Sequence, residues 1–177
     1  MTGEIVETEA YIGPEDKASH AYSNRRTERT SVQFGERGHA YVFRIYGIYN
    51  CFCVVIGPRY VPAVALIRAI RPVEGVDAIR YNRNASPNLP LTNLTNGPSK
   101  LCQAFRILDA FNGIDLLGDK LFLSDHSGQP AIDLSARIGI DYAYEFKDVP
   151  WRFYAKGSPF VSHVPTQCRH HGKRPRQ

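Results

Sequence analysis

Short runs rich in β-branched and aromatic residues recur along the chain, and turn-forming residues separate them. The longer runs, which predict strands, are Ile5 to Tyr11, Ala40 to Ile45, Ile48 to Ile56 and Val64 to Ile70. Shorter strands are predicted at Leu121 to Leu123, Ala136 to Ile140 and Trp151 to Ala155, and short helices at Glu74 to Tyr81 and Pro98 to Ile107. Many strands and few helices in 177 residues predict a single α+β domain with a curved, mainly antiparallel β-sheet and short helices around it.

Two of these runs are separated by Tyr46 and Gly47, which predicts a protruding β-hairpin whose tip uses the backbone freedom of Gly47. The Tyr46 side chain either folds back onto the body or stands in solvent. An exposed aromatic side chain on a rigid hairpin could enter a stack of DNA bases. The neighbouring Tyr41, Phe43 and Tyr49 offer further faces for stacking unpaired bases.

Three acidic residues, Glu4, Glu7 and Glu9, lie in or beside the first predicted strand. Alternation along a strand places Glu7 and Glu9 on one face, roughly 7 Å apart at the backbone. This face is either solvated at a sheet edge, or it holds buried carboxylates that must be hydrogen-bonded or used. Paired carboxylates could also act as acid and base in glycoside hydrolysis. The spacing alone leaves these alternatives open.

A formal net charge of +5 is typical of a protein that meets nucleic acid or an anionic membrane. Four bases and no acid lie in residues 169–177, so most of the excess belongs to the C-terminal end. A second basic segment, residues 17–37, carries five bases and two acids in a predicted loop that could meet phosphates. An arginine-rich loop is, on its own, more often simply solvated.

Several classes of protein are disfavoured by the same sequence. No stretch approaches the ~20 apolar residues of a membrane span, and the acidic N-terminus lacks the apolar core of a secretory signal. The four cysteines fit no disulfide framework, which indicates a reducing compartment. Cys51 and Cys53 have no second ligand pair at zinc-finger spacing, so we expect no metal site. We expect a protein that is not secreted: cytoplasmic or nucleoid-associated in a bacterium, nuclear in a eukaryote.

The order of several motifs resembles one family, the 3-methyladenine DNA glycosylases of the alkyladenine type. The likeness begins with the segment Ile5 to Tyr11, followed by Gly13 to Asp16 and His20. It continues through Tyr41-Val42-Phe43, Ile45-Tyr46-Gly47, Leu66-Ile67-Arg68-Ala69, Gly97 to Leu101, Arg137-Ile138-Gly139, Arg152-Phe153-Tyr154 and Gly157-Ser158-Pro159. It spans about Ile5 to Ser162, with a variable patch around Arg83 to Thr95.

The resemblance implies a base-excision-repair enzyme that flips an alkylated or deaminated purine out of duplex DNA and hydrolyses its N-glycosidic bond with an activated water. Glu9 would be the general base, and no cofactor, metal or obligate protein partner would be needed by a monomer of this kind. The base pocket would be formed by Tyr11, His20, Phe43, Cys53 and Arg68. Tyr46 would intercalate, and Arg25, Thr27, Lys100 and Ser158 would contact the DNA backbone.

The chain departs from the family pattern in three places. Phe43 replaces a pocket tyrosine of related animal enzymes, and Cys53 replaces the usual asparagine, which predicts looser exclusion of guanine. Only four residues precede Ile5, where family members usually have several dozen, so we expect either a fragment or a fold that tolerates an open edge. Two alternatives follow: a catalytically inactive DNA-binding relative and, less consistent with Tyr46, a carbohydrate hydrolase. We expect one glycosylase domain over residues 1–165 and a basic tail over residues 166–177 that adds salt-sensitive DNA affinity.

Overall fold

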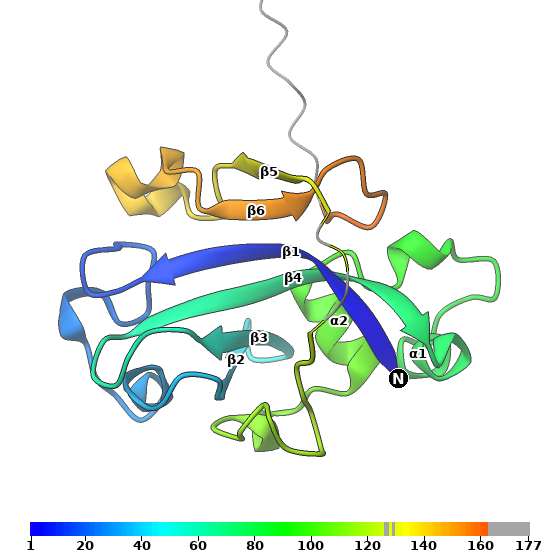
Figure 1. The fold of residues 1–177 in the computed structure, drawn as a ribbon, viewed down its shortest axis with the longest axis horizontal. Coiled ribbons are helices and arrows are strands. Elements are labelled where there is room, and N and C mark those ends of the chain that lie inside the picture. Colours follow the sequence, from blue (N-terminus) through cyan, green and yellow to red (C-terminus); the bar gives the residue numbers. More distant parts are fainter. Residues whose placement is uncertain (126–127, 129, 163–177) are drawn as a thin grey trace, which may run out of the picture.

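Six antiparallel strands form one sheet in the computed structural model, which describes residues 1–125, 128 and 130–162. The strands are β1 (Thr2–Ile12), β2 (Ala40–Ile45), β3 (Tyr49–Val55), β4 (Ala63–Glu74), β5 (Ile132–Ser135) and β6 (Arg152–Ala155). Their order across the sheet is β2-β3-β4-β1-β6-β5, so β1 and β4 are central (Figure 1). This arrangement confirms the predicted α+β domain with a mainly antiparallel sheet. The proposed basic tail, residues 166–177, lies outside the described residues.

Two α-helices, α1 (Val76–Asn82) and α2 (Pro98–Phe105), follow β4 in the chain (Figure 1). Helix α2 packs on one face of the sheet because its apolar side is buried against β2, β3 and β4. The contacting side chains are Leu101 and Cys102 from α2 with Val42, Phe52, Ile67 and Ile70 from the strands. Four short 3-10 turns occupy Tyr22–Asn24, Ser31–Phe34, Leu91–Asn93 and Asp109–Phe111, and a longer, kinked 3-10 segment occupies Asp141–Asp148.

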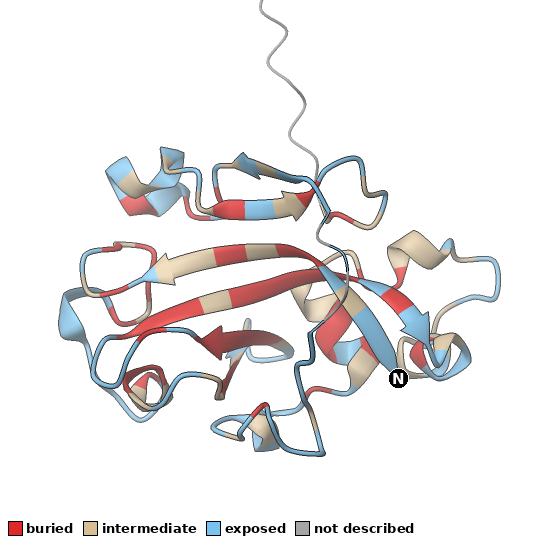
Figure 2. Ribbon diagram, viewed as in Figure 1, coloured by how far each residue is buried: buried red, intermediate tan, exposed pale blue. Residues whose placement is uncertain are grey.

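The opposite face of the sheet carries a second apolar cluster. Alternation along β3 sends Phe52 and Val54 toward α2 and sends Cys51, Cys53 and Val55 to the other side. Figure 2 shows that buried residues concentrate on β3, β4 and the middle of β1. Nothing in the described ranges is a helix long and apolar enough to cross a lipid bilayer.

The predicted elements are present with three corrections. Leu121 to Leu123 is not a strand, and the strand predicted at Ala136 to Ile140 lies instead at Ile132–Ser135. The later segment leaves the sheet because the Ile138 N–H donates to the Glu9 carboxylate and Gly139 has a φ of 75°. Glu74 ends β4 rather than starting a helix, because Gly75, with a φ of 74°, separates the strand from α1.

Candidate active site

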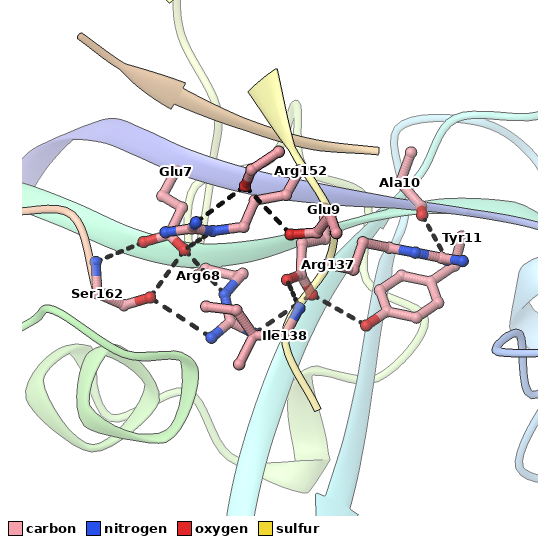
Figure 3. Close-up of polar contacts among 11 residues, drawn as sticks. Glu7, Glu9, Ala10, Tyr11, Arg68, Arg137, Ile138, Arg152 and Ser162 are labelled. Carbon is pink, nitrogen blue, oxygen red and sulfur yellow. Dashed lines mark hydrogen bonds and ion pairs between the residues drawn. The ribbon is translucent and has the colours of Figure 1, made fainter. Parts of the chain in front are cut away.

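The Glu9 carboxylate lies in the middle of β1, between β4 and β6, and is fully buried (0% exposed). Its Oε1 accepts the Ile138 N–H at 2.7 Å, and its Oε2 accepts the Tyr11 hydroxyl at 2.9 Å (Figure 3). The Arg68 Nη1 also donates to Oε2, at a longer 3.3 Å. The interpretation of this face as a solvated sheet edge is therefore wrong: the carboxylate is held by three donors from three segments.

Glu7 is the second buried carboxylate, with 1% of its surface exposed. Its Oε1 accepts hydrogen bonds from Arg68 Nε at 2.9 Å, Arg152 Nε at 2.7 Å and Ser162 Oγ at 2.7 Å, while its Oε2 accepts the Ser162 N–H at 2.6 Å. Burial alone would raise the pKa of Glu7, but the Ser162 and Arg152 hydrogen bonds and the Arg68 charge outweigh it and lower the pKa. Glu7 is thus ionised, and both of its carboxylate oxygens accept hydrogen bonds from the protein.

The sequence did not suggest the buried ion pair between Arg137 and Asp16. This pair supports two of the groups that bind Glu9. Arg137 donates to both oxygens of Asp16, at 2.6 and 2.9 Å, and to the Ala10 carbonyl at 2.9 Å. Its guanidinium lies 4.6 Å from the centre of the Tyr11 ring. Because Arg137 precedes Ile138, this pair fixes both the Tyr11 ring and the backbone N–H that holds Glu9.

A pocket of about 480 Å³ opens in front of these groups. Every residue predicted for base recognition lines it: Tyr11 from β1, His20, Phe43 from β2, Cys53 from β3 and Arg68 from β4. The three partners of Glu9, namely Tyr11, Arg68 and Ile138, all line the same cavity. The predicted pocket set is thus brought together, and the candidate base lies directly behind its wall.

His20 is held neutral at the edge of the pocket. Its Nε2 lies 3.3 Å from the Arg29 Nη2, and because arginine can only donate, Nε2 must accept. The proton is therefore on Nδ1, which donates to the Tyr41 hydroxyl at 2.9 Å. Burial, with the charges of Arg29 and Arg25, lowers the pKa of His20 to about 4. The ring also packs edge-on against Phe43, with 4.7 Å between the ring centres.

Tyr46 stands at the tip of the β2–β3 hairpin with 89% of its surface exposed. Tyr46 and Gly47 have φ angles of 50° and 72°, values that suit a tight hairpin turn. The side chain lies on the rim of the 480 Å³ pocket. The alternative in which this tip folds back onto the body is wrong.

The four residues predicted to contact the DNA backbone are placed differently. Arg25 and Thr27 line a second pocket, of about 300 Å³, which shares His20 and Arg29 with the first. Lys100, in the first turn of α2, donates to Asn96 Oδ1 at 2.7 Å and lines neither pocket. Ser158 lies in the turn after β6, where its Oγ accepts the Phe160 N–H at 3.3 Å. Arg25 and Thr27 are therefore grouped with the pocket, whereas Lys100 and Ser158 line neither cavity.

No cluster of three or more histidine, cysteine or acidic side chains suited to a metal ion occurs among the residues the structure describes. Cys51 and Cys53 are buried free thiols in the pocket wall. Burial raises the pKa of Cys51 to about 11 and that of Cys53 well above its usual value. Both therefore contribute neutral, weakly polar surface to the pocket.

Sequence comparisons identify relatives over most of the chain. A family model described as Methylpurine-DNA glycosylase (MPG) matches residues 1–159. A Clostridium novyi protein named "Putative 3-methyladenine DNA glycosylase" is 48% identical over 167 residues, which are 92% of this chain and 83% of that relative. Proteins of the same name from Bacillus cytotoxicus and Bacillus cereus are each 49% identical over 170 residues, 91% of this chain and 83% of theirs. The chain therefore belongs to the methylpurine-DNA glycosylase family.

Proposed function

We propose that this protein excises alkylated or deaminated purines from duplex DNA by flipping the damaged nucleotide into the 480 Å³ pocket and hydrolysing its N-glycosidic bond. The observation that carries the proposal is the buried Glu9 carboxylate, held by three donors immediately behind the wall of an aromatic pocket. A base in that pocket would present its sugar carbon to the carboxylate side. Base recognition, catalysis and DNA binding would each use a separate group of residues.

Base recognition would depend on aromatic faces. Tyr11 and Phe43 line the pocket from different strands, and a flipped purine between them would gain stacking and, when alkylated and cationic, cation–π attraction. His20, neutral with its proton on Nδ1, would face the base edge beside them. The thiol of Cys53 would replace a stronger amide donor and would admit the exocyclic amino group of guanine more readily.

Catalysis would use Glu9 to activate water. The water oxygen attacks the sugar C1′, its proton passes to the Glu9 carboxylate, and the C1′–N bond breaks with its electron pair leaving on the purine. The negative carboxylate also stabilises the positive charge that develops on the sugar. Of the three hydrogen bonds to Glu9, the one from Arg68 is the longest at 3.3 Å and is the one that water would displace.

DNA would be held around the pocket mouth. Tyr46, exposed on the hairpin tip, would fill the space left by the flipped base and so offset part of the cost of unstacking. Arg25 and Thr27 would meet phosphates beside His20, with Lys100 and Ser158 at more distant positions on the backbone. Lys100 would act as a DNA contact and not as a covalent nucleophile, so borohydride should trap no enzyme–DNA adduct.

The direct test is strand cleavage at a defined lesion. Duplex oligonucleotides carrying hypoxanthine or ethenoadenine are incubated with the protein, and abasic sites are then cut with alkali. We expect breaks with the parent chain, none with Glu9→Gln, and parental activity with Glu4→Gln, a matched change on the same strand whose carboxylate pairs with Arg71 at the surface. Binding of lesion DNA by the parent without breaks would instead support an inactive DNA-binding relative.

A further inference from the structure

Glu7 is a fully bonded, buried carboxylate for which the proposed reaction has no use. It does not line the pocket, and its four contacts come from β4, β6 and the segment that ends at Ser162. Such burial is costly unless the charge does something for its neighbours. The same arrangement argues against a glycosidase-like carboxylate pair, because Glu7 has no face toward a substrate.

Arg68 connects the two carboxylates, as Figure 3 shows. Its Nε donates to Glu7 at 2.9 Å, whereas its Nη1 reaches Glu9 only at 3.3 Å. Nη2 is additionally directed to Ser162 Oγ at 3.4 Å. The guanidinium is therefore held by Glu7 and only loosely by Glu9.

The charged groups around Glu9 determine what would happen if Glu7 no longer held Arg68. Among the described residues, the titratable or charged side chains around it come from five segments: Glu7 and Tyr11 on β1, Cys51 and Cys53 on β3, Arg68 on β4, Arg137 after β5, and Arg152 on β6, which is opposite Glu9 in the ladder. Without the Glu7 charge, the nearest carboxylate for Arg68 would be Glu9. Arg68 would then close on the Glu9 oxygen that water needs.

We propose that Glu7 is a positioning residue that holds Arg68 back from Glu9, so that one Glu9 oxygen stays available to activate water. This inference rests on the proposed function, because it concerns the same reaction. Ser162 supports this arrangement, because its backbone N–H and its hydroxyl both donate hydrogen bonds to the Glu7 carboxylate.

The test is the pH dependence of single-turnover excision from hypoxanthine DNA by the full chain, the Glu7→Gln variant and the Glu7→Asp variant. Glu7→Gln should lower the plateau rate roughly tenfold and move the acidic limb of the profile to lower pH by about one unit. Glu7→Asp keeps the charge, so its acidic limb should coincide with that of the parent. Affinity for lesion DNA, measured by fluorescence anisotropy, should change by less than about threefold in both variants, because Glu7 does not line the pocket.

Each outcome decides the inference. A rate loss in Glu7→Gln with an unmoved acidic limb, or an equal shift in Glu7→Asp, would overturn it and leave Glu7 a purely structural residue. Should Glu7→Gln fail to fold, Ser162→Ala removes the hydroxyl contacts with Glu7 and with Arg68 Nη2, which together keep the guanidinium away from Glu9. Its acidic limb must then move in the same direction or the inference fails. Absence of excision by the parent chain would instead refute the proposed function, and loss of excision in Glu9→Gln separates the two.

Discussion

The buried pair of Asp16 and Arg137 gives the most decisive test of the architecture behind the pocket. Both side chains are fully buried, and Arg137 makes two hydrogen bonds to Asp16, at 2.6 and 2.9 Å. Asp16 also accepts the backbone N–H groups of Ala18 at 2.9 Å and Ile12 at 3.2 Å. The substitution Asp16→Asn keeps the shape of the side chain but removes its charge, which leaves the Arg137 guanidinium buried without a carboxylate.

Removal of one member of a buried ion pair costs about 3–5 kcal/mol, because the remaining charge loses its compensation in a medium of low polarity. A domain of this size has a total stability of about 5–15 kcal/mol, so the loss is a large part of it. With a denaturant slope of about 2 kcal/mol/M, the urea midpoint should fall by about 2 M. The free energy of unfolding of Asp16→Asn in buffer should therefore be well below that of the parent chain.

Urea unfolding followed by circular dichroism measures this change, with Glu145→Gln as the matched control. Glu145 pairs with Lys17, the residue after Asp16, but both groups are exposed to solvent, so this pair should contribute little to stability. The double variant Asp16→Leu with Arg137→Met should recover most of the lost stability, since apolar replacement of a whole buried pair is often neutral. A cost for Asp16→Asn no larger than that of Glu145→Gln would refute the reasoning.

Three further predictions concern single residues. Tyr46→Ala should weaken binding of lesion duplex in anisotropy titrations while changing the unfolding free energy by less than about 0.5 kcal/mol, because the side chain is 89% exposed; a large stability loss would contradict this. Cys53→Asn should reduce excision of 7-methylguanine and guanine relative to hypoxanthine, and unchanged selectivity in parallel assays would count against the looser-exclusion hypothesis. His20, whose pKa is lowered to about 4, takes up a proton in the unfolded chain near pH 6.5, so stability should decline as pH falls from 6.5 toward 4; urea titrations of His20→Gln should lack this part of the slope.

The sheet and the hairpin could be predicted because their signals are local. Alternation along Ile48 to Ile56 and the glycine at position 47 are enough to place β3 and the turn before it. Apolar residues also alternate in the segment Ala136 to Ile140, but it is not a strand, since the Ile138 N–H donates to Glu9 instead of to a neighbouring strand. The alternation is present in the sequence, but a tertiary hydrogen bond takes the backbone N–H that a strand would use for pairing.

Burial of the acidic strand could not be predicted in the same way. Alternation assigns Glu7 and Glu9 to faces, but which face is covered depends on Arg152 and Ser162, which lie more than 140 residues away from Glu7 in the chain. The register of β1 against β4 also shifts on both sides of Glu7, an irregularity with no marker in the sequence. The family resemblance assigns a role to Glu9, whereas for Glu7 the sequence offers only the alternative of a carboxylate pair for glycoside hydrolysis.

The buried ion pairs around Glu9 act on the geometry of the site more than on the stability of the fold. Arg137 with Asp16, and Arg68 and Arg152 with Glu7, gain little net stability from their charges because desolvation offsets the attraction. The two Glu7 pairs join β4 and β6 to β1, and Arg137 joins its segment to the turn after β1 through Asp16 and to β1 itself through the Ala10 carbonyl. If stability were the purpose, apolar side chains of the same volume would serve as well, but they could not direct the Ile138 N–H at Glu9 or hold the Arg68 guanidinium back from it. We infer that these charges fix the geometry of the Glu9 carboxylate, so the apolar double variant at positions 16 and 137 should regain stability without regaining the parental excision rate.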